Sequence, residues 1–243
     1  MSALLEVEGL TKRFGGVTAV DACSFSVPEG SVTALVGPNG SGKTTAFNLI
    51  TGYARPDAGA IRFAGTPVRR PDPIRLARRG LTRTFQQARI FADLTLVQNV
   101  VAALQQPWHA ALRRAVKRLE RARALELLEE FGLARLAHER AGSLSYGQKK
   151  LLEFATVLMA EPRLVLLDEP TAGVNPVLVE QIEQRVRDLN ARGLTFLVVE
   201  HNMNLVMRLC DPVVVLDHGT KLAEGRPDEV RSDPRVLDAY LGG

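Results

Sequence analysis

Residues 37–45 of the 243-residue chain, GPNGSGKTT, fit the phosphate-binding pattern G-x-x-x-x-G-K-[ST] at every fixed position. An apolar, β-branched run precedes them and a segment with helical spacing follows, which predicts the strand, loop and helix that the pattern requires. Glycines let backbone N–H groups turn toward an anion, and the helix N-terminus adds its positive dipole. We therefore expect a nucleotide site in which Lys43 reaches the outer phosphates and Thr44 ligates Mg²⁺.

Further candidate residues follow two apolar runs. Residues 163–167 end at Asp168 and Glu169, and residues 194–199 lead to His201. Continuous apolar runs are typical of buried parallel strands, whose carboxyl ends meet at one edge of a sheet. An Asp at that edge can hold Mg²⁺, and the adjoining Glu can orient or deprotonate a water. The imidazole of His201 would reach the same edge, beside a γ-phosphate.

Three more positions carry two interpretations each. Gln86 follows a predicted strand at 81–85, where its carbonyl oxygen can hold Mg²⁺ or a water, and a surface glutamine is the alternative. Phe14 precedes two glycines, so its ring could stack on a base or belong to the core. Ser145 is an N-cap candidate, which together with the Gly147 N–H predicts either an anion site or simply a capped helix.

Composition restricts the class of protein. Apolar residues make up 46% and charged residues 24% of the chain, which is ordinary for a globular protein with one large α/β domain, with or without a subdomain. We find no run of about 18 apolar residues and no basic segment leading into an apolar one at the N-terminus, so we expect a cytoplasmic location. Cys23 and Cys210 lie far apart without C-x-x-C spacing and are expected to be reduced core thiols.

The net charge of +4 comes largely from residues 112–123, which contain six basic residues and one acid. Leu112, Val116 and Leu119 recur there at helical spacing, which predicts a basic amphipathic helix. One interpretation is a solvated face on a helix that buries a thin apolar stripe, and another is proximity to anionic lipid head groups. Nucleic acid is disfavoured because no aromatic residues interleave with the charges.

The rest of the pattern predicts the order of elements along the chain. We expect an antiparallel ribbon over 4–27, a strand at 61–63, a short basic helix between 71 and 80, helical structure from 95 to 131, a helix over 177–190, a closing hairpin over 213–225 and a small helical tail.

In this order, the motifs of essentially the whole chain resemble those of an ATP-binding cassette (ABC) subunit of a membrane transporter. The Walker A loop, here residues 37–44, is shared by many NTPases. Its combination with a glutamine loop at Gln86, a signature at residues 144–148 and a histidine at His201 is specific to that family. Residues 144–148 read LSYGQ where the family has LSGGQ, so that Tyr146 replaces the first glycine. Asn175 stands where the interfacial loop usually has Asp.

The resemblance implies an α/β fold with a P-loop NTPase core and a mostly parallel sheet. It also implies an N-terminal antiparallel β subdomain and an inserted α-helical subdomain at about 88–160. A single ABC domain would then span residues 1–243 and end in a short helical tail at about 227–243.

The match also implies a role for each site residue. The phosphate loop would comprise Gly37, Asn39, Gly40, Ser41, Gly42, Lys43, Thr44 and Thr45. ATP would stack on Phe14, and Mg²⁺ would be positioned by Thr44, Gln86 and Asp168. Glu169 would act as general base and His201 would contact the γ-phosphate, with Gln86 sensing metal and water. Ser145, Gly147 and Gln148 would serve the nucleotide of a neighbouring subunit.

The partners implied by the resemblance are a second ABC ATPase subunit, identical or paralogous, and membrane permease subunits. Two ATPase subunits would pack head to tail around two ATP molecules, on the inner face of the membrane. A solute-binding protein would take part indirectly, and no nucleic acid is expected.

Less specific stretches resemble the LivG-type ATPases of branched-chain amino acid importers, at residues 84–86, 90–91, 101–123, 172–176, 200–203 and 233–242. ATPases for urea or amide uptake and for lipopolysaccharide export share much of this pattern. A mechanoenzyme acting on DNA or ribosomes is disfavoured because the chain has neither a second cassette nor a heptad pattern. A nucleotide-sensing regulator that binds nucleotide but barely hydrolyses it is disfavoured because Glu169 is present.

Overall fold

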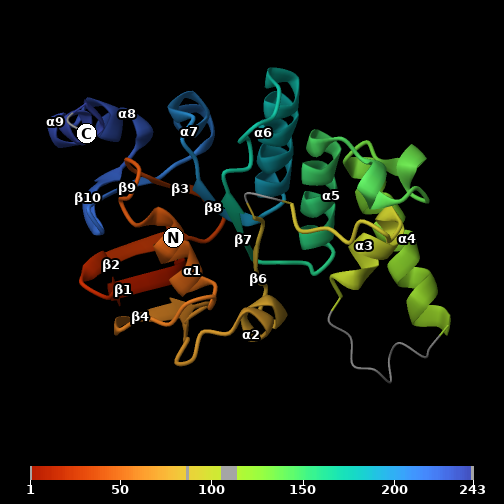
Figure 1. The fold of residues 1–243 in the computed structure, drawn as a ribbon, viewed down its shortest axis with the longest axis horizontal. Helices are drawn as coiled ribbons and strands as arrows, with labels where there is room; N and C mark the ends of the chain where they lie inside the picture. Colours follow the sequence, from red (N-terminus) through yellow and green to blue (C-terminus); the bar gives the residue numbers. More distant parts are fainter. Residues whose placement is uncertain (1, 86–87, 105–113, 242–243) are drawn as a thin grey trace.

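The structure is a computed structural model that describes residues 2–85, 88–104 and 114–241. Its centre is a six-stranded sheet with the strand order β10-β9-β3-β8-β7-β6 (Figure 1). The pairs β9–β3, β3–β8, β8–β7 and β7–β6 are parallel, and only β9–β10 is antiparallel. The strands are β3 (Val32–Val36), β6 (Leu81–Arg83), β7 (Leu164–Asp168), β8 (Thr195–Val199), β9 (Val213–Asp217) and β10 (Thr220–Gly225).

Both faces of this sheet are covered, which explains why its central strands are continuous apolar runs rather than alternating ones. In β7, Leu164 and Leu166 face one hydrophobic cluster, whereas Val165 and Leu167 face the other. All five residues of β7 are buried. The charged residue of β7, Asp168, is the last residue of the strand, at the end where the candidate site lies.

A second, antiparallel sheet has the strand order β2-β1-β4-β5. Its strands are β1 (Ala3–Phe14), β2 (Val17–Pro28), β4 (Ala58–Phe63) and β5 (Thr66–Pro67). Helix α1 (Lys43–Ile50) shares one hydrophobic cluster with both sheets, because Phe47 and Ile50 pack with Leu5 of β1 and Leu35 of β3. The helix that follows the phosphate loop is thus fixed from two sides.

The remaining helices lie mainly on the other side of the parallel sheet and beyond its end (Figure 1). They are α2 (Pro73–Arg78), α3 (Leu96–Ala102), α4 (Arg114–Glu130), α5 (Tyr146–Leu158), α6 (Pro176–Ala191), α7 (Met203–Leu209), α8 (Pro227–Ser232) and α9 (Pro234–Leu241), with short 3₁₀ turns at Ala134–Leu136 and Ala141–Ser143. Helices α3, α4 and α5 pack on one another to the right of the sheets in Figure 1. None of the helices in the described ranges is both long and apolar enough to cross a bilayer.

Most of the predicted elements are confirmed, including the antiparallel ribbon, the short basic helix, the closing hairpin and the helical tail. Both cysteines are free and buried, as expected. The predicted strand at 81–85 ends at Arg83, and the helix α7 is a finding that the sequence pattern did not predict. The limits predicted for a helical subdomain, near residues 88 and 160, stay a prediction.

One expectation about the basic helix is wrong. Leu119 was predicted to lie on an apolar stripe, but its exposed fraction is 72%. The buried face of α4 comes later, at Ala124, Leu127 and Leu128, which pack into the main core. Periodicity identifies the apolar face of a helix but not the length over which another element covers it. Leu112 lies outside the described residues.

Buried Asn99 ties α3 to the loop that precedes it. Its side chain accepts a hydrogen bond from the Phe91 N–H at 2.7 Å. It donates to the carbonyl oxygens of Phe91 at 3.0 Å, Leu94 at 3.3 Å and Thr95 at 3.0 Å. Because only 2% of Asn99 is exposed, water cannot take over the hydrogen bonds that its side-chain amide donates.

Replacing Asn99 by Asp should destabilise the protein, because a carboxylate oxygen would then face three carbonyl oxygens without a proton to share. We expect the free energy of unfolding in urea to fall by at least about 2 kcal/mol. Asn204→Asp, the same change at an exposed position of α7, is the control and should stay within about 0.5 kcal/mol of the parent. Equal denaturation midpoints for the two variants would contradict the role of Asn99.

Candidate nucleotide site

The phosphate loop between β3 and α1 needs glycine for reasons of space and of backbone conformation. A Cβ on Gly37 would lie 2.1 Å from the Leu216 carbonyl oxygen, and one on Gly42 would lie 2.4 Å from the Ala19 carbonyl oxygen. Gly40 has φ +80°, which side chains rarely adopt, and faces open space. The loop is therefore packed tightly from behind and open on one side at Asn39 and Gly40, both of which are exposed.

Lys43 lies over this loop with an exposed fraction of 6%. Its ammonium donates hydrogen bonds to the carbonyl oxygens of Gly37 at 2.9 Å and Pro38 at 2.8 Å, and to Ser41 Oγ at 3.4 Å. Burial lowers the pKa of Lys43, and the nearby Glu169 carboxylate opposes this shift. The loop thus holds a desolvated positive charge, which is what an anionic ligand would find there.

The N-terminus of α1 is suited to an anion. Its N-cap residue, Gly42, has no side chain and so leaves the first N–H groups of the helix without a side-chain cap. Thr44, in the first turn, is exposed, and Thr45 is half-buried. The positive end of the helix dipole and the exposed Thr44 therefore lie beside the loop, where an anion could bind.

Two hairpins brace the loop. The Gly219 N–H, in the turn between β9 and β10, donates to the Ser41 carbonyl oxygen at 3.1 Å. The Asp21 N–H of β2 donates to the Gly219 carbonyl oxygen at 2.9 Å. Phe14, at the tip of the same β1–β2 hairpin, is 55% exposed, which excludes the core interpretation. Lys12 Nζ lies 5.4 Å from the centroid of its ring, and stacking on a base stays a prediction.

Strands β7 and β8 bring Glu169 and His201 together. Glu169 Oε1 and His201 Nε2 are 3.0 Å apart, with 20% and 46% of the side chains exposed. Glu169 has φ +46°, unusual for a side-chain-bearing residue, and its N–H donates to the Val199 carbonyl oxygen at 2.9 Å. An adjoining pocket of about 480 Å³, lined among others by Asn202, leaves room beside this pair.

Asp168, the last residue of β7, is held by a residue that the sequence patterns did not indicate. Arg83 Nη2 donates to Asp168 Oδ2 at 2.6 Å, and the two side chains are 6% and 10% exposed. The Asp168 carboxylate and the Thr44 hydroxyl are hard oxygen ligands, so the donor chemistry at this edge fits Mg²⁺. Gln86, the third predicted ligand and a predicted catalytic residue, lies outside the described residues.

The sequence patterns also did not indicate a structural role for Glu200, which lies between β8 and His201. Its exposed fraction is 4%, and it binds both the Thr171 N–H at 3.0 Å and the Thr171 hydroxyl. Its other oxygen accepts the N–H groups of His201 at 3.0 Å and Asn202 at 3.2 Å. Glu200 thereby fixes the loops that follow β7 and β8 relative to each other.

The signature segment starts helix α5. Ser145 Oγ accepts the Gln148 N–H at 3.3 Å, and Gln148 Oε1 accepts the Ser145 N–H at 3.0 Å, so the predicted N-cap is a complete capping box. A Cβ on Gly147 would lie 2.5 Å from Leu178 Cδ2 of α6. Tyr146 donates from its hydroxyl to the Ala172 carbonyl oxygen at 3.2 Å. These contacts fix the segment within this chain and leave Ser145 exposed.

Asn175, which stands where the related loops have Asp, has a local role. Its side chain accepts the Leu178 N–H at 2.9 Å and so caps α6. Asn and Asp cap helices about equally well, so the departure leaves the helix start intact. Pro176 at the first helical position adds a fixed φ.

Helix α5 also holds the segment that flanks Gln86. Glu153 Oε1 accepts the N–H groups of Phe85 at 3.0 Å and Arg89 at 3.4 Å, and Lys150 Nζ donates to the Phe85 carbonyl oxygen at 3.1 Å. Both charged residues are buried, with 4% of Glu153 and 1% of Lys150 exposed. Burial raises the pKa of Glu153 to about 7 from an ordinary 4.5, against the opposing effect of the Phe85 N–H.

Comparison with known proteins places this geometry in a family. Residues 20–172, more than half of the chain, match the family described as "ABC transporter". The chain belongs to the ABC transporter family. It is an ATPase of that family. Residues 220–243 match a second family, described as "Branched-chain amino acid ATP-binding cassette transporter".

Individual relatives agree with this membership over nearly the full length. The chain is 41% identical to the high-affinity branched-chain amino acid transport ATP-binding protein BraF of Pseudomonas aeruginosa, and the match covers 98% of each chain. It is 36% identical to the high-affinity branched-chain amino acid transport ATP-binding protein LivG of Escherichia coli, and this match also covers 98% of each chain. Among solved structures, a nucleotide-free ATP-binding cassette from an ABC transporter has a TM-score of 0.88 at 34% identity and covers 100% of each chain. An ADP-bound cassette has a TM-score of 0.87.

The raised pKa of Glu153 predicts a pH dependence of stability. Between pH 4.5 and about 7 the unfolded chain loses the proton of Glu153 while the folded chain keeps it, so stability falls as pH rises. Glu153→Gln removes this effect. Its free energy of unfolding relative to the parent should rise by roughly 2–3 kcal/mol across that window and then level off.

Urea denaturation at pH values from 4.5 to 8 measures this difference. Glu129→Gln, at an exposed position of α4, is the control and should show a difference that does not change with pH. If the Glu153→Gln difference is equally flat, the carboxyl group does not hold its proton in the folded protein.

Proposed function

We propose that this chain hydrolyses ATP to drive the import of branched-chain amino acids through a membrane permease. The observation that carries the proposal is the convergence of a phosphate loop containing Lys43 with the Glu169–His201 pair at one edge of the parallel sheet. The choice of substrate is supported by the names of the curated relatives and by the family match over residues 220–243.

In this proposal the described residues divide the work of binding and hydrolysis. The loop amides, the α1 N-terminus and Lys43 bind the β- and γ-phosphates, and Phe14 stacks on the adenine. Mg²⁺, held by Thr44 and Asp168, would offset negative charge on the phosphate oxygens. Glu169 accepts the proton of the water that attacks the γ-phosphorus, the bond from that phosphorus to the β–γ bridging oxygen breaks, and ADP leaves. His201 orients Glu169 and contacts the γ-phosphate.

We further propose that Ser145, Gly147 and Gln148 contact ATP bound to a second ATPase subunit, identical or paralogous. Two features support this proposal: the capping box leaves the start of α5 exposed, and the helix dipole there is positive toward solvent. The assembly would lie on the inner face of the membrane beside permease subunits, with a solute-binding protein delivering the amino acid.

Glu169→Gln should abolish turnover without abolishing ATP binding, because it removes the base and keeps a side chain of the same shape. We expect kcat to fall by roughly 10²- to 10⁴-fold. The variant should also accumulate as an ATP-bound dimer in size-exclusion chromatography. Steady-state ATPase assays with the purified transporter assembly measure the first effect.

Two further variants make this result specific. Lys43→Ala should weaken ATP binding itself by roughly 10- to 100-fold, because a charge-assisted contact to phosphate is lost. Glu161→Gln, at an exposed position before β7, should behave as the parent. Near-normal hydrolysis by the Glu169→Gln variant would remove Glu169 from the role of base.

The transport assignment predicts what co-purifies with the tagged protein from gently solubilised native membranes. We expect two related permease subunits and a solute-binding protein that binds leucine, isoleucine or valine. Binding of urea or an amide by that protein would change the substrate. Recovery of lipopolysaccharide-export components, ribosomes or DNA would retain the ATPase chemistry and overturn the import assignment.

A further inference from the structure

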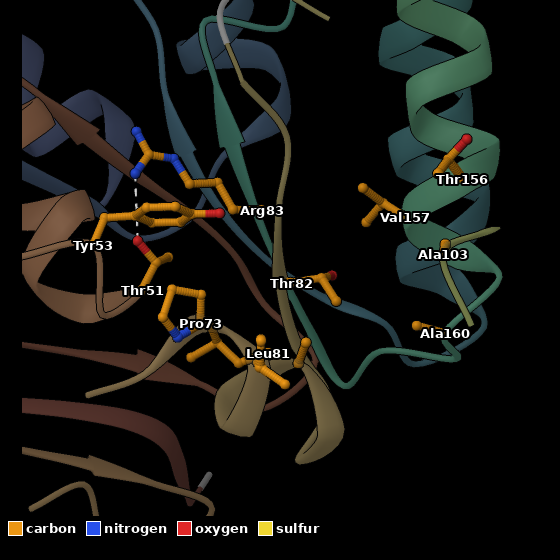
Figure 2. Close-up of a pocket in the computed structure, with 12 residues that line it drawn as sticks. Thr51, Tyr53, Pro73, Leu81, Thr82, Arg83, Ala103, Thr156, Val157 and Ala160 are labelled. Carbon is orange, nitrogen blue, oxygen red and sulfur yellow. Dashed lines mark hydrogen bonds between the residues drawn. The ribbon is translucent and has the colours of Figure 1, made fainter. Parts of the chain in front are cut away.

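Arg83, at the end of β6, joins three parts of the molecule through one buried guanidinium. Nη2 donates to Asp168 Oδ2 of β7 at 2.6 Å. Nη1 donates to Asn48 Oδ1 of α1 at 2.7 Å and to Thr51 Oγ1, just beyond α1, at 3.3 Å. Figure 2 shows the side chain reaching from its strand past Tyr53, with the bond to Thr51 drawn as a dashed line.

Aromatic rings enclose this guanidinium. The Arg83 Cζ atom lies 5.4 Å from the ring centroid of Phe47, 5.9 Å from that of Tyr53 and 5.2 Å from that of Phe85. Tyr53 and Phe85 are themselves in edge-to-face contact, with centroids 5.5 Å apart. With 6% of its side chain exposed, Arg83 is confined by both hydrogen bonds and rings.

The consequence for Asp168 is a fixed orientation. A buried carboxylate is costly unless it is paired, and a partner that is itself immobile sets the rotamer of the carboxylate as well as offsetting its charge. The Arg83 bond is to Oδ2 and not to Oδ1, so we expect Oδ1 to be the oxygen that meets a metal ion. The same arginine is bonded to α1, the helix that carries Thr44.

We propose that Arg83 is a positioning residue that orients Asp168 toward Mg²⁺ and sets its distance from the Thr44 helix. This inference rests on the proposed function, since it concerns the metal that accompanies ATP. Residues that hold a metal ligand from behind commonly change metal affinity by roughly 10- to 100-fold when they are replaced.

Two physical effects of Arg83 would change the affinity for Mg²⁺ in opposite directions. Its positive charge repels a cation nearby, so its removal could tighten Mg²⁺ binding. Its hydrogen bonds keep Asp168 in one place, so its removal weakens Mg²⁺ binding. The short Arg83–Asp168 bond and the enclosed guanidinium favour the second effect, because the arginine charge is already compensated by the carboxylate.

The test measures binding of a fluorescent N-methylanthraniloyl derivative of ATP to the purified chain, first in EDTA and then across a Mg²⁺ titration. Arg83→Met keeps the length and apolar stem of the side chain and removes the donors. We expect the half-saturating Mg²⁺ concentration to rise by roughly 10- to 100-fold while the affinity in EDTA stays within about twofold of the parent. Arg83→Lys, which keeps the charge but lacks the planar fork that reaches Asp168 and Asn48 at once, should lie between.

Asn48→Ala and Arg79→Met complete the design. Asn48→Ala removes an anchor of Arg83 without touching Asp168 and should produce a smaller shift of the same kind, even if Arg83→Met fails to fold. Arg79 stacks on Phe63 and donates to its carbonyl oxygen, so Arg79→Met removes a comparable arginine away from the site and should leave the Mg²⁺ dependence unchanged.

The outcomes separate this inference from the proposed function. An unchanged or lowered Mg²⁺ requirement in Arg83→Met would overturn the positioning role, and so would an equal loss of affinity in EDTA and in Mg²⁺, which indicates a purely structural residue. Failure of the parent protein to bind the ATP derivative at all would instead overturn the proposed nucleotide site.

Discussion

The parallel pairing of β3, β8 and β7 determines where Lys43, Asp168, Glu169 and His201 lie. Parallel neighbours end at the same edge of a sheet, so α1 with Lys43, the Asp168–Glu169 pair and His201 emerge side by side although they come from distant parts of the chain. Both faces of the sheet are covered by apolar clusters, which leaves that edge as the place where charged groups meet an incoming ligand.

Buried charges then set the precision of this edge. Arg83, Lys150, Glu153 and Glu200 are all nearly inaccessible to water, and each is bonded to a loop or strand end next to a candidate site residue. Burying a charge without a partner would cost several kcal/mol, so each of these groups restricts its neighbours to arrangements that keep it bonded. Burial also disfavours the charged form of Glu153 and raises its pKa to about 7.

The local elements that carry the candidate site residues could be predicted from the sequence, because these elements depend on short motifs with strong local rules. Ser145 illustrates this, since its capping box with Gln148 spans three residues. By contrast, Arg83 meets Asp168 across 85 positions and Glu153 meets Phe85 across 68, and no local pattern encodes such pairs. The prediction that Leu119 is buried was wrong for a related reason, because helical periodicity does not show whether another element covers the apolar face of a helix.

The central claim is that ATP binds where these strands end, with its phosphates on the loop that carries Lys43. A structure determined with a slowly hydrolysed ATP analogue and Mg²⁺ tests this claim most directly. It should show the γ-phosphate within hydrogen-bond distance of Lys43 Nζ, the metal about 2.1 Å from Thr44 Oγ1, and the adenine against Phe14. Nucleotide bound elsewhere, with the Lys43 ammonium still donating to Gly37 and Pro38, would contradict it.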